Sequence, residues 1–115
     1  KAVGKGASHT GTEHHWYMQV SAVGLAFLVP TFLFIFGRAL GKGHAEVIAT
    51  FSHPFVAILT GLVIFISMRH FAKGATMMIE DYLRGAARKA AVIAAISLSY
   101  AIIAVGLFAL AKIAL

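Results

Sequence analysis

One histidine, His70, lies just beyond a long apolar segment and has the chemistry to bind a metal or a haem iron. The segment runs over residues 56–67, so the imidazole is expected at the edge of a bilayer. Imidazole is a common protein ligand of haem iron, and ionisable side chains within membrane bundles tend to be functional. Ser67 and Gly74 share nearly the same helix face and leave space for a flat macrocycle. The alternative is an interfacial histidine whose polar edge stays among the headgroups.

A carboxylate and a phenol, Asp81 and Tyr82, follow about three helical turns after His70. On a continuous helix, Asp81 returns to within roughly 20° of the His70 face, about 16 Å further along the axis. A phenol can donate a hydrogen bond to a quinone carbonyl, and a carboxylate can transfer protons. The pair therefore suggests a quinone site. The simpler interpretation is a capping acid followed by a tyrosine of the membrane interface.

A haem with two histidine ligands needs a second imidazole besides His70. His53 lies about 25 Å away along a helix, so it cannot share the iron. His14 and His15 are expected on the same membrane side as His70, which allows a pair within the chain. A ligand from a partner subunit is the other option. His53 precedes Pro54, and a structural role at a helix start is the more ordinary expectation there.

The elements that must position these residues are membrane helices. The chain has 115 residues, of which 60% are hydrophobic and 12% charged, too apolar for a soluble domain of this size. Three windows carry no Asp, Glu, Lys or Arg: residues 14–37, 47–68 and 90–111. As a helix, each window can cross a hydrocarbon core of about 30 Å. Little of the chain is left for a soluble catalytic domain.

We predict an all-α membrane protein with three transmembrane helices in a single membrane-anchor domain, 1–115. The predicted helices cover about 14–37, 45–73 and 88–112. Pro30 should kink the first of them. The third carries small residues every fourth position, which permits close helix packing. These small residues are Ala87, Ala91, Ala95 and Ser99.

The net charge of +6 reports orientation in the membrane rather than nucleic-acid binding. Seven of the basic residues are expected on one side of the bilayer and three on the other. By the positive-inside rule, the N-terminus is then cytoplasmic. The chain has no cysteine, which excludes an iron–sulfur cluster held by its own thiolates. Any electrons must therefore arrive from another subunit.

Two segments resemble a known family. His70-Phe-Ala-Lys-Gly74, followed by Met78-Ile79-Glu80-Asp81-Tyr82, resembles the second-helix motif of the hydrophobic membrane anchor subunits of succinate dehydrogenase, respiratory complex II. Gly11-Thr-Glu-His-His-Trp16, with Ser21-Ala22 following, is similar to the start of the family's first helix, and Ser52-His-Pro54 to the start of its second. The resemblance covers nearly the whole chain.

The resemblance implies a role for each residue singled out above. His70 would be an axial ligand of haem b, with the second histidine supplied by a companion three-helix subunit, the SdhC-type cytochrome b subunit. Tyr82 would hydrogen-bond ubiquinone near the iron–sulfur subunit, with Asp81 supporting that site. His14 would lie near the haem propionates. Succinate oxidation would belong to the flavoprotein subunit, and the complex to the bacterial cytoplasmic (inner) membrane.

One position departs from the family pattern. The first helix of this family often carries an arginine that holds a haem propionate, and this chain has Gln19 there. Arg69, Lys73 and His15 are the candidates to replace it.

Two other functions compete with the leading one. The chain could anchor another quinone-linked enzyme, such as fumarate reductase. A hydrogenase-type anchor fits less well, because such subunits usually hold two haems with several histidines deep in the helices. The second rival is a non-redox small membrane subunit, in which His70 and Tyr82 are interfacial residues only.

Overall fold

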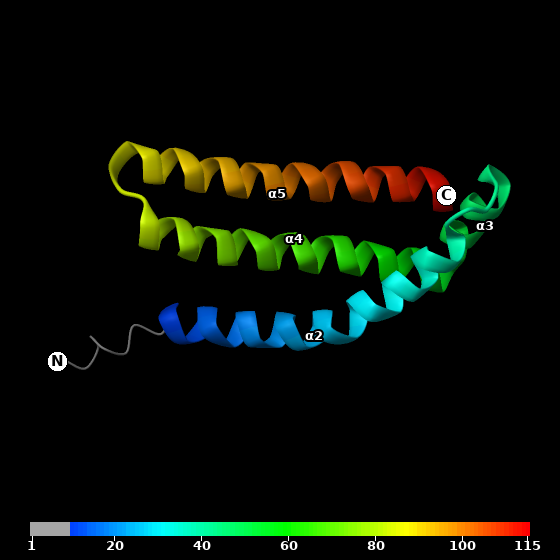
Figure 1. Ribbon diagram of the computed structural model, residues 1–115, viewed down its shortest axis with the longest axis horizontal. Coiled ribbons are helices and arrows are strands. Elements are labelled where there is room, and N and C mark those ends of the chain that lie inside the picture. Colours follow the sequence, from blue (N-terminus) through cyan, green and yellow to red (C-terminus); the bar gives the residue numbers. More distant parts are fainter. Residues whose placement is uncertain (1–9) are drawn as a thin grey trace.

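Three long helices lie side by side in a row in the computed structural model, which describes residues 10–115 (Figure 1). They are α2 (Thr10–Ala39), α4 (Pro54–Tyr82) and α5 (Gly85–Ala114), and a short helix α3 (His44–Ser52) lies at one end. α4 is the central helix: it packs against both α2 and α5, whereas α2 and α5 do not contact each other within the described residues. The two outer spans are therefore connected through α4 and, at one end, through the short helix α3, which contacts both of them.

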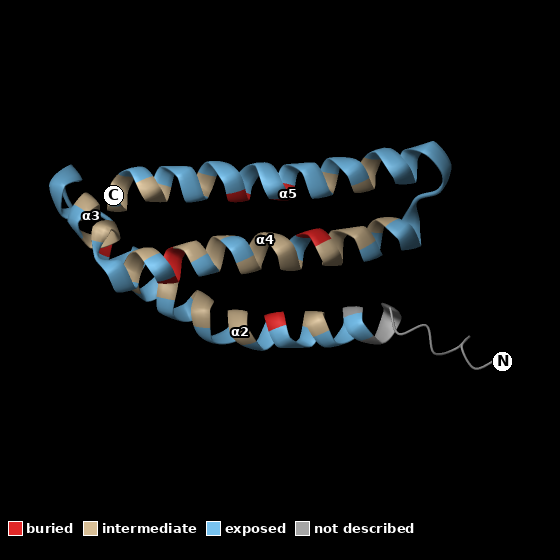
Figure 2. Ribbon diagram, turned by 180° about the vertical axis from the view of Figure 1, so that it is seen from behind, coloured by how far each residue is buried: buried red, intermediate tan, exposed pale blue. Residues whose placement is uncertain are grey.

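The prediction of an all-α membrane protein with three spans is confirmed. Within the described residues, three helices are long and apolar enough to cross a bilayer: His15–Ala39, Pro54–Tyr82 and Gly85–Ala114. Few of their residues are buried, and Figure 2 shows exposed surface along most of α2 and α5. A row of apolar helices with both faces open is suited to a surrounding of lipid or of partner helices.

α2 begins at Thr10 and changes direction part-way along its length (Figure 1). Pro30 lies inside it. The proline has no N–H to donate and its ring displaces the carbonyl of the preceding turn, which bends a helix. Thr31, the next residue, bonds back within the helix, since its Oγ1 donates to the Phe27 carbonyl at 2.9 Å.

The segment predicted as one helix over about 45–73 is divided in two at Pro54. α3 ends at Ser52 and α4 begins at Pro54, with His53 in an extended conformation between them (φ −63°, ψ 129°). Proline disfavours the helical conformation for the residue before it, which explains the break. His53 Nδ1 accepts a hydrogen bond from the Phe55 N–H at 3.2 Å and so caps α4. Beyond the break, α4 continues through Gly74 to Tyr82.

The α4–α5 hairpin is built on small residues. Only Leu83 and Arg84 separate the two helices, and Gly85 has φ +62°, a conformation that favours glycine. Ser99 on α5 is only 1% exposed. A Cβ added to Gly106 would lie 3.2 Å from Ile64 Cδ1, closer than an ordinary contact. The small side chains thus let α4 and α5 approach closely, as the alanine-rich pattern of the third helix suggests.

Candidate functional site

His70 is joined to the neighbouring span by a hydrogen bond. Its Nδ1 lies 2.8 Å from the Oγ of Ser21, 49 residues earlier in the chain. Ser21 is on α2 and is only 7% exposed, while the His70 side chain on α4 is half-buried. The contact therefore fixes the imidazole ring at the α2–α4 interface.

The hydrogen-bond pattern around Ser21 is compatible with a His70 ring that carries its proton on Nδ1. Ser21 Oγ also donates to the Met18 carbonyl at 3.2 Å. A serine hydroxyl has a single proton. When that proton points at the Met18 carbonyl, His70 Nδ1 donates to Ser21 Oγ. The other ring nitrogen, Nε2, is then unprotonated and has a lone pair available to bind a metal.

Two cations lie close to His70 along α4. The Arg69 guanidinium carbon is 5.6 Å from the centroid of the Tyr17 ring and 5.6 Å from that of Phe65. Lys73 Nζ is 5.7 Å from the Tyr17 centroid. These distances are in the range of cation–π interactions. The Tyr17 ring on α2 thus holds two positive charges on α4 near His70, whereas Gln19 is exposed.

The other residues predicted around a haem are placed less directly. Ser67 and Gly74 are half-buried on α4. A Cβ at Gly74 would lie 3.7 Å from Met18 Cε, so the open side of this glycine adjoins α2. The His14 side chain lies outside the described residues. That Ser67, Gly74 and His14 lie close to a bound haem stays a prediction.

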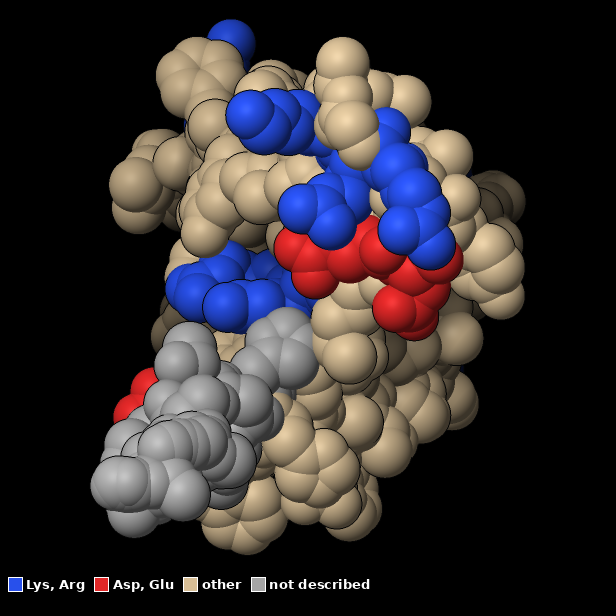
Figure 3. Space-filling model, turned by 90° about the vertical axis from the view of Figure 1, so that its left-hand side faces the viewer, with Lys and Arg blue, Asp and Glu red and all other residues tan. Residues whose placement is uncertain are grey.

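Asp81 and Tyr82 lie at the end of α4, next to the α4–α5 turn. Both side chains are exposed, Tyr82 to 81%. Twelve residues separate Tyr82 from His70 on the same helix, which corresponds to about 18 Å along the axis. The structure therefore does not bring the carboxylate and the phenol together with the imidazole. Figure 3 views this end of the bundle, where acidic side chains lie beside basic ones.

The remaining donors do not form a conventional metal site. Within the described residues, no group of three or more His, Cys, Asp or Glu side chains is placed to hold a metal ion. His53 caps α4 and His44 is the exposed first residue of α3. His70 therefore offers one nitrogen donor, which fits a haem iron whose second axial ligand comes from another chain.

Comparison with known proteins shows to which family the chain belongs. The family model described as succinate dehydrogenase/fumarate reductase transmembrane subunit matches residues 1–108. The chain belongs to this family. It is also 44% identical over 114 residues to the succinate dehydrogenase hydrophobic membrane anchor subunit of Paracoccus denitrificans, with 99% of this chain and 88% of the relative covered. No solved structure matches it.

The resemblance predicted from the motifs around His70 and Tyr82 is thus confirmed at the level of the family. As a transmembrane subunit of the succinate dehydrogenase/fumarate reductase family, the chain is a multi-pass membrane anchor of an enzyme complex.

Sequence reasoning placed Ser21 in a segment that resembles the family's first helix but missed it as a partner of His70 in this transmembrane subunit. Ser21 is one of three hydroxyl-bearing residues in the charge-free window 14–37, with Tyr17 and Thr31, and polar side chains in such windows commonly bond across helices. That signal indicates an interhelical contact. It does not identify His70 as the partner, because the register between α2 and α4 is not encoded in either helix alone.

Proposed function

We propose that this chain anchors succinate:quinone oxidoreductase in the bacterial inner membrane, with His70 as an axial ligand of haem b. Its partners would be the companion cytochrome b subunit, which supplies the second histidine, together with the iron–sulfur and flavoprotein subunits. The excess of basic residues near the α4–α5 turn supports a cytoplasmic N-terminus. That end would then face the soluble subunits.

The hydrogen bond between His70 Nδ1 and Ser21 Oγ is the observation that carries the proposal. Histidines that bind metals usually donate their second ring N–H to a neighbouring acceptor, which fixes the tautomer and the ring orientation. An interfacial histidine needs no such partner, because headgroups and water can satisfy both nitrogens. Here the partner is buried and lies on another span, which favours the ligand role.

A bound haem b would supply a one-electron carrier within the membrane. His70 would hold it through Nε2, and Ser21 would keep the imidazole in the required orientation. Arg69 and Lys73 place two positive charges near His70 and so suit the carboxylates of the haem propionates. They would take the place of the family arginine that is missing at Gln19.

Tyr82 and Asp81 would contribute to the site of ubiquinone reduction. Conversion of the quinone to the quinol takes two electrons and two protons. Tyr82 can donate a hydrogen bond to a quinone carbonyl oxygen, and Asp81 can pass protons from water. Their exposure at the end of α4 leaves both side chains free for a partner subunit to complete the site.

Replacement of His70 tests the haem assignment. In the purified complex, His70→Ala should abolish the low-spin haem b spectrum or shift its midpoint potential markedly. His44→Ala is the matched control, because it removes an exposed imidazole at the opposite end of the bundle. An unchanged spectrum and potential in His70→Ala would refute the assignment.

Replacement of Tyr82 tests the quinone assignment. Tyr82→Phe removes only the hydroxyl and should slow ubiquinone reduction while leaving succinate oxidation by an artificial dye largely intact. Tyr100→Phe, which removes a hydroxyl from an exposed position within α5, is the control. Equal loss in the quinone and dye assays would contradict a quinone role for Tyr82.

Fumarate reduction is the second candidate direction, because the matching family model covers transmembrane subunits of both enzymes. The same His70 and Tyr82 sites would serve either direction. Comparing succinate–quinone with quinol–fumarate turnover in the purified complex distinguishes the two. Faster fumarate reduction by quinol would assign the chain to fumarate reductase.

A further inference from the structure

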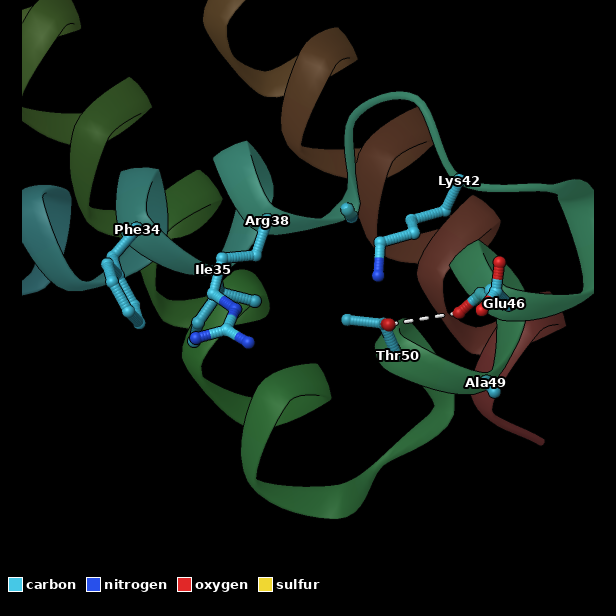
Figure 4. Close-up of a pocket in the computed structure, with 8 residues that line it drawn as sticks. Phe34, Ile35, Arg38, Lys42, Glu46, Ala49 and Thr50 are labelled. Carbon is cyan, nitrogen blue, oxygen red and sulfur yellow. Dashed lines mark hydrogen bonds between the residues drawn. The ribbon is translucent and has the colours of Figure 1, made fainter.

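A pocket of about 470 Å³ lies between the end of α2 and the short helix α3. It is at the end of the bundle away from the α4–α5 turn (Figure 1). Figure 4 shows side chains from both helices around it. The lining residues are Phe34, Ile35, Arg38, Ala39, Lys42, Glu46, Ala49 and Thr50. None of them belongs to the haem and quinone sites proposed above.

Two positive charges converge on this pocket. In Figure 4, the Arg38 guanidinium and the Lys42 ammonium both point into the space between α2 and α3. Among the described residues, neither makes an ion pair with a carboxylate. Glu46 Oε1 accepts a hydrogen bond from the Gly43 N–H at 3.4 Å and so caps α3. The pocket therefore has two cations and one carboxylate, a net positive charge.

One wall of the pocket is apolar and continuous with the membrane span. The candidate span on α2 ends at Ala39, so Phe34 and Ile35 lie inside it and Arg38 lies at its last turn. The Arg38 guanidinium carbon is 5.6 Å from the centroid of the Phe34 ring, which is 64% exposed. Charged groups and an open apolar surface thus meet where the span reaches the membrane surface.

An amphiphile satisfies both halves of this pocket. A phosphodiester can take hydrogen bonds from a guanidinium and an ammonium at once, and its acyl chains can cover the exposed face of α2. Lys and Arg side chains at a membrane surface attract anionic lipid headgroups. A soluble anion would leave the Phe34 and Ile35 surface uncovered, so the apolar wall favours a lipid over a free anion.

We propose that the pocket formed by Arg38, Lys42 and the Phe34–Ile35 wall binds the phosphate headgroup of an anionic phospholipid. The bound lipid would fill the space between α2 and α3 and fix the angle at which α3 leaves the bundle. This proposal is independent of the haem and the quinone.

The test measures retention of lipid by the purified complex carrying Arg38→Gln and Lys42→Gln together. Each cation near an anionic headgroup should contribute about five-fold to affinity, so the double variant should bind phosphatidylglycerol about thirty-fold more weakly. Native mass spectrometry after delipidation and titration with phosphatidylglycerol micelles gives the affinity. Micelles of phosphatidylcholine and inorganic phosphate alone form the comparison arms.

The control variant is Lys112→Gln. This lysine is on the last turn of α5, next to the Phe108 ring and outside the pocket lining. It should leave phosphatidylglycerol binding unchanged. Equal loss in the control would show that only general surface charge is at work, and unchanged binding in the double variant would refute the site. Binding of inorganic phosphate equal to that of the lipid would show a free-anion site. Dissociation of a partner subunit from the double variant, with lipid binding intact, would show that a protein occupies the pocket.

Discussion

The two helix contacts made by α4 differ in chemistry. Toward α2, the contact is polar: Ser21 bonds to His70, and the Tyr17 ring lies near two cations of α4. Toward α5, it depends on close approach at small residues, with Gly106 against Ile64 and Gly61 near Leu110. In a membrane, close packing alone is enough to hold two helices together. The α2–α4 pair thus adds hydrogen-bonding and cation–π contacts to its packing, whereas the α4–α5 pair relies on small residues.

The largest effect is expected when the polar contact between α2 and α4 is removed at Ser21. Ser21→Ala should weaken haem retention by about 10–100-fold, because loss of a hydrogen bond to a metal-bound histidine typically has an effect of this size. Transfer of haem to an excess of a scavenger protein measures retention, and the midpoint potential and electron paramagnetic resonance spectrum report the ligand's orientation. Ser21→Thr, which keeps the hydroxyl, should restore all three.

Ser52→Ala is the control for Ser21, since the Ser52 hydroxyl bonds only to the Ala49 carbonyl of its own helix. If His70→Ala loses haem while Ser21→Ala does not, the ligand assignment stands and the role of Ser21 is wrong.

The stability of the α4–α5 contact should depend on the volume of the side chain at position 106. Gly106→Val should destabilise the α4–α5 pair by about 2 kcal/mol, because the new side chain would overlap Ile64. Gly24→Val is the matched control, since no heavy atom lies within 4 Å of a Cβ added there. The fraction of intact complex during titration with a denaturing detergent measures the loss. Equal stability of the two variants would show that α4 and α5 do not pack as closely as described.

The cation–π contacts should have a smaller effect. Tyr17→Leu keeps an apolar side chain at the α2–α4 interface but removes the aromatic face near Arg69 and Lys73. The expected loss is about 0.5–1 kcal/mol of stability. Phe108→Leu, which removes the ring near Lys112 at the end of α5, provides the comparison. A thermal stability of Tyr17→Leu equal to that of the parent complex would argue against the contact.

The smallest effect is expected at Thr60. Its Oγ1 is buried without a hydrogen-bond partner in the described residues, one turn before Ile64 on α4. Thr60→Val removes the unpaired hydroxyl at nearly constant volume and should change stability by about 0.5 kcal/mol or less, in the favourable direction. Thr76→Val, which deletes a hydroxyl that donates to the Ala72 carbonyl at 2.7 Å, should not gain stability. A clear destabilisation by Thr60→Val would show that the Thr60 hydroxyl has a polar partner on the neighbouring helix.

The spans and the break at Pro54 illustrate what a sequence reveals on its own. Three charge-free windows predict three spans, because a charged side chain in the hydrocarbon is costly whatever the tertiary structure. The division at His53-Pro54 follows from local sterics, and a proline at that position could have predicted it. The helix predicted over about 45–73 instead takes Pro54 into its first turns, where a proline is structurally ordinary.

The hydrogen bond between Ser21 and His70 illustrates what the sequence did not reveal. The two residues are 49 positions apart, and their pairing depends on the axial register of α2 against α4. Apolar faces in lipid set that register only weakly, because lipid tails and leucine side chains are equally apolar. The polar site could therefore be anticipated in its residue types but not in its pairings.

The two-residue link between α4 and α5 has a consequence for the order of folding. Leu83 and Arg84 close a very short loop, so the α4–α5 contacts join segments that are near each other in the chain at a small cost in loop entropy. The α2–α4 contacts must close a longer loop that includes α3. Low contact order favours the early formation of the hairpin. α2 would then dock last, and the imidazole would acquire its fixed orientation only at the final step of assembly.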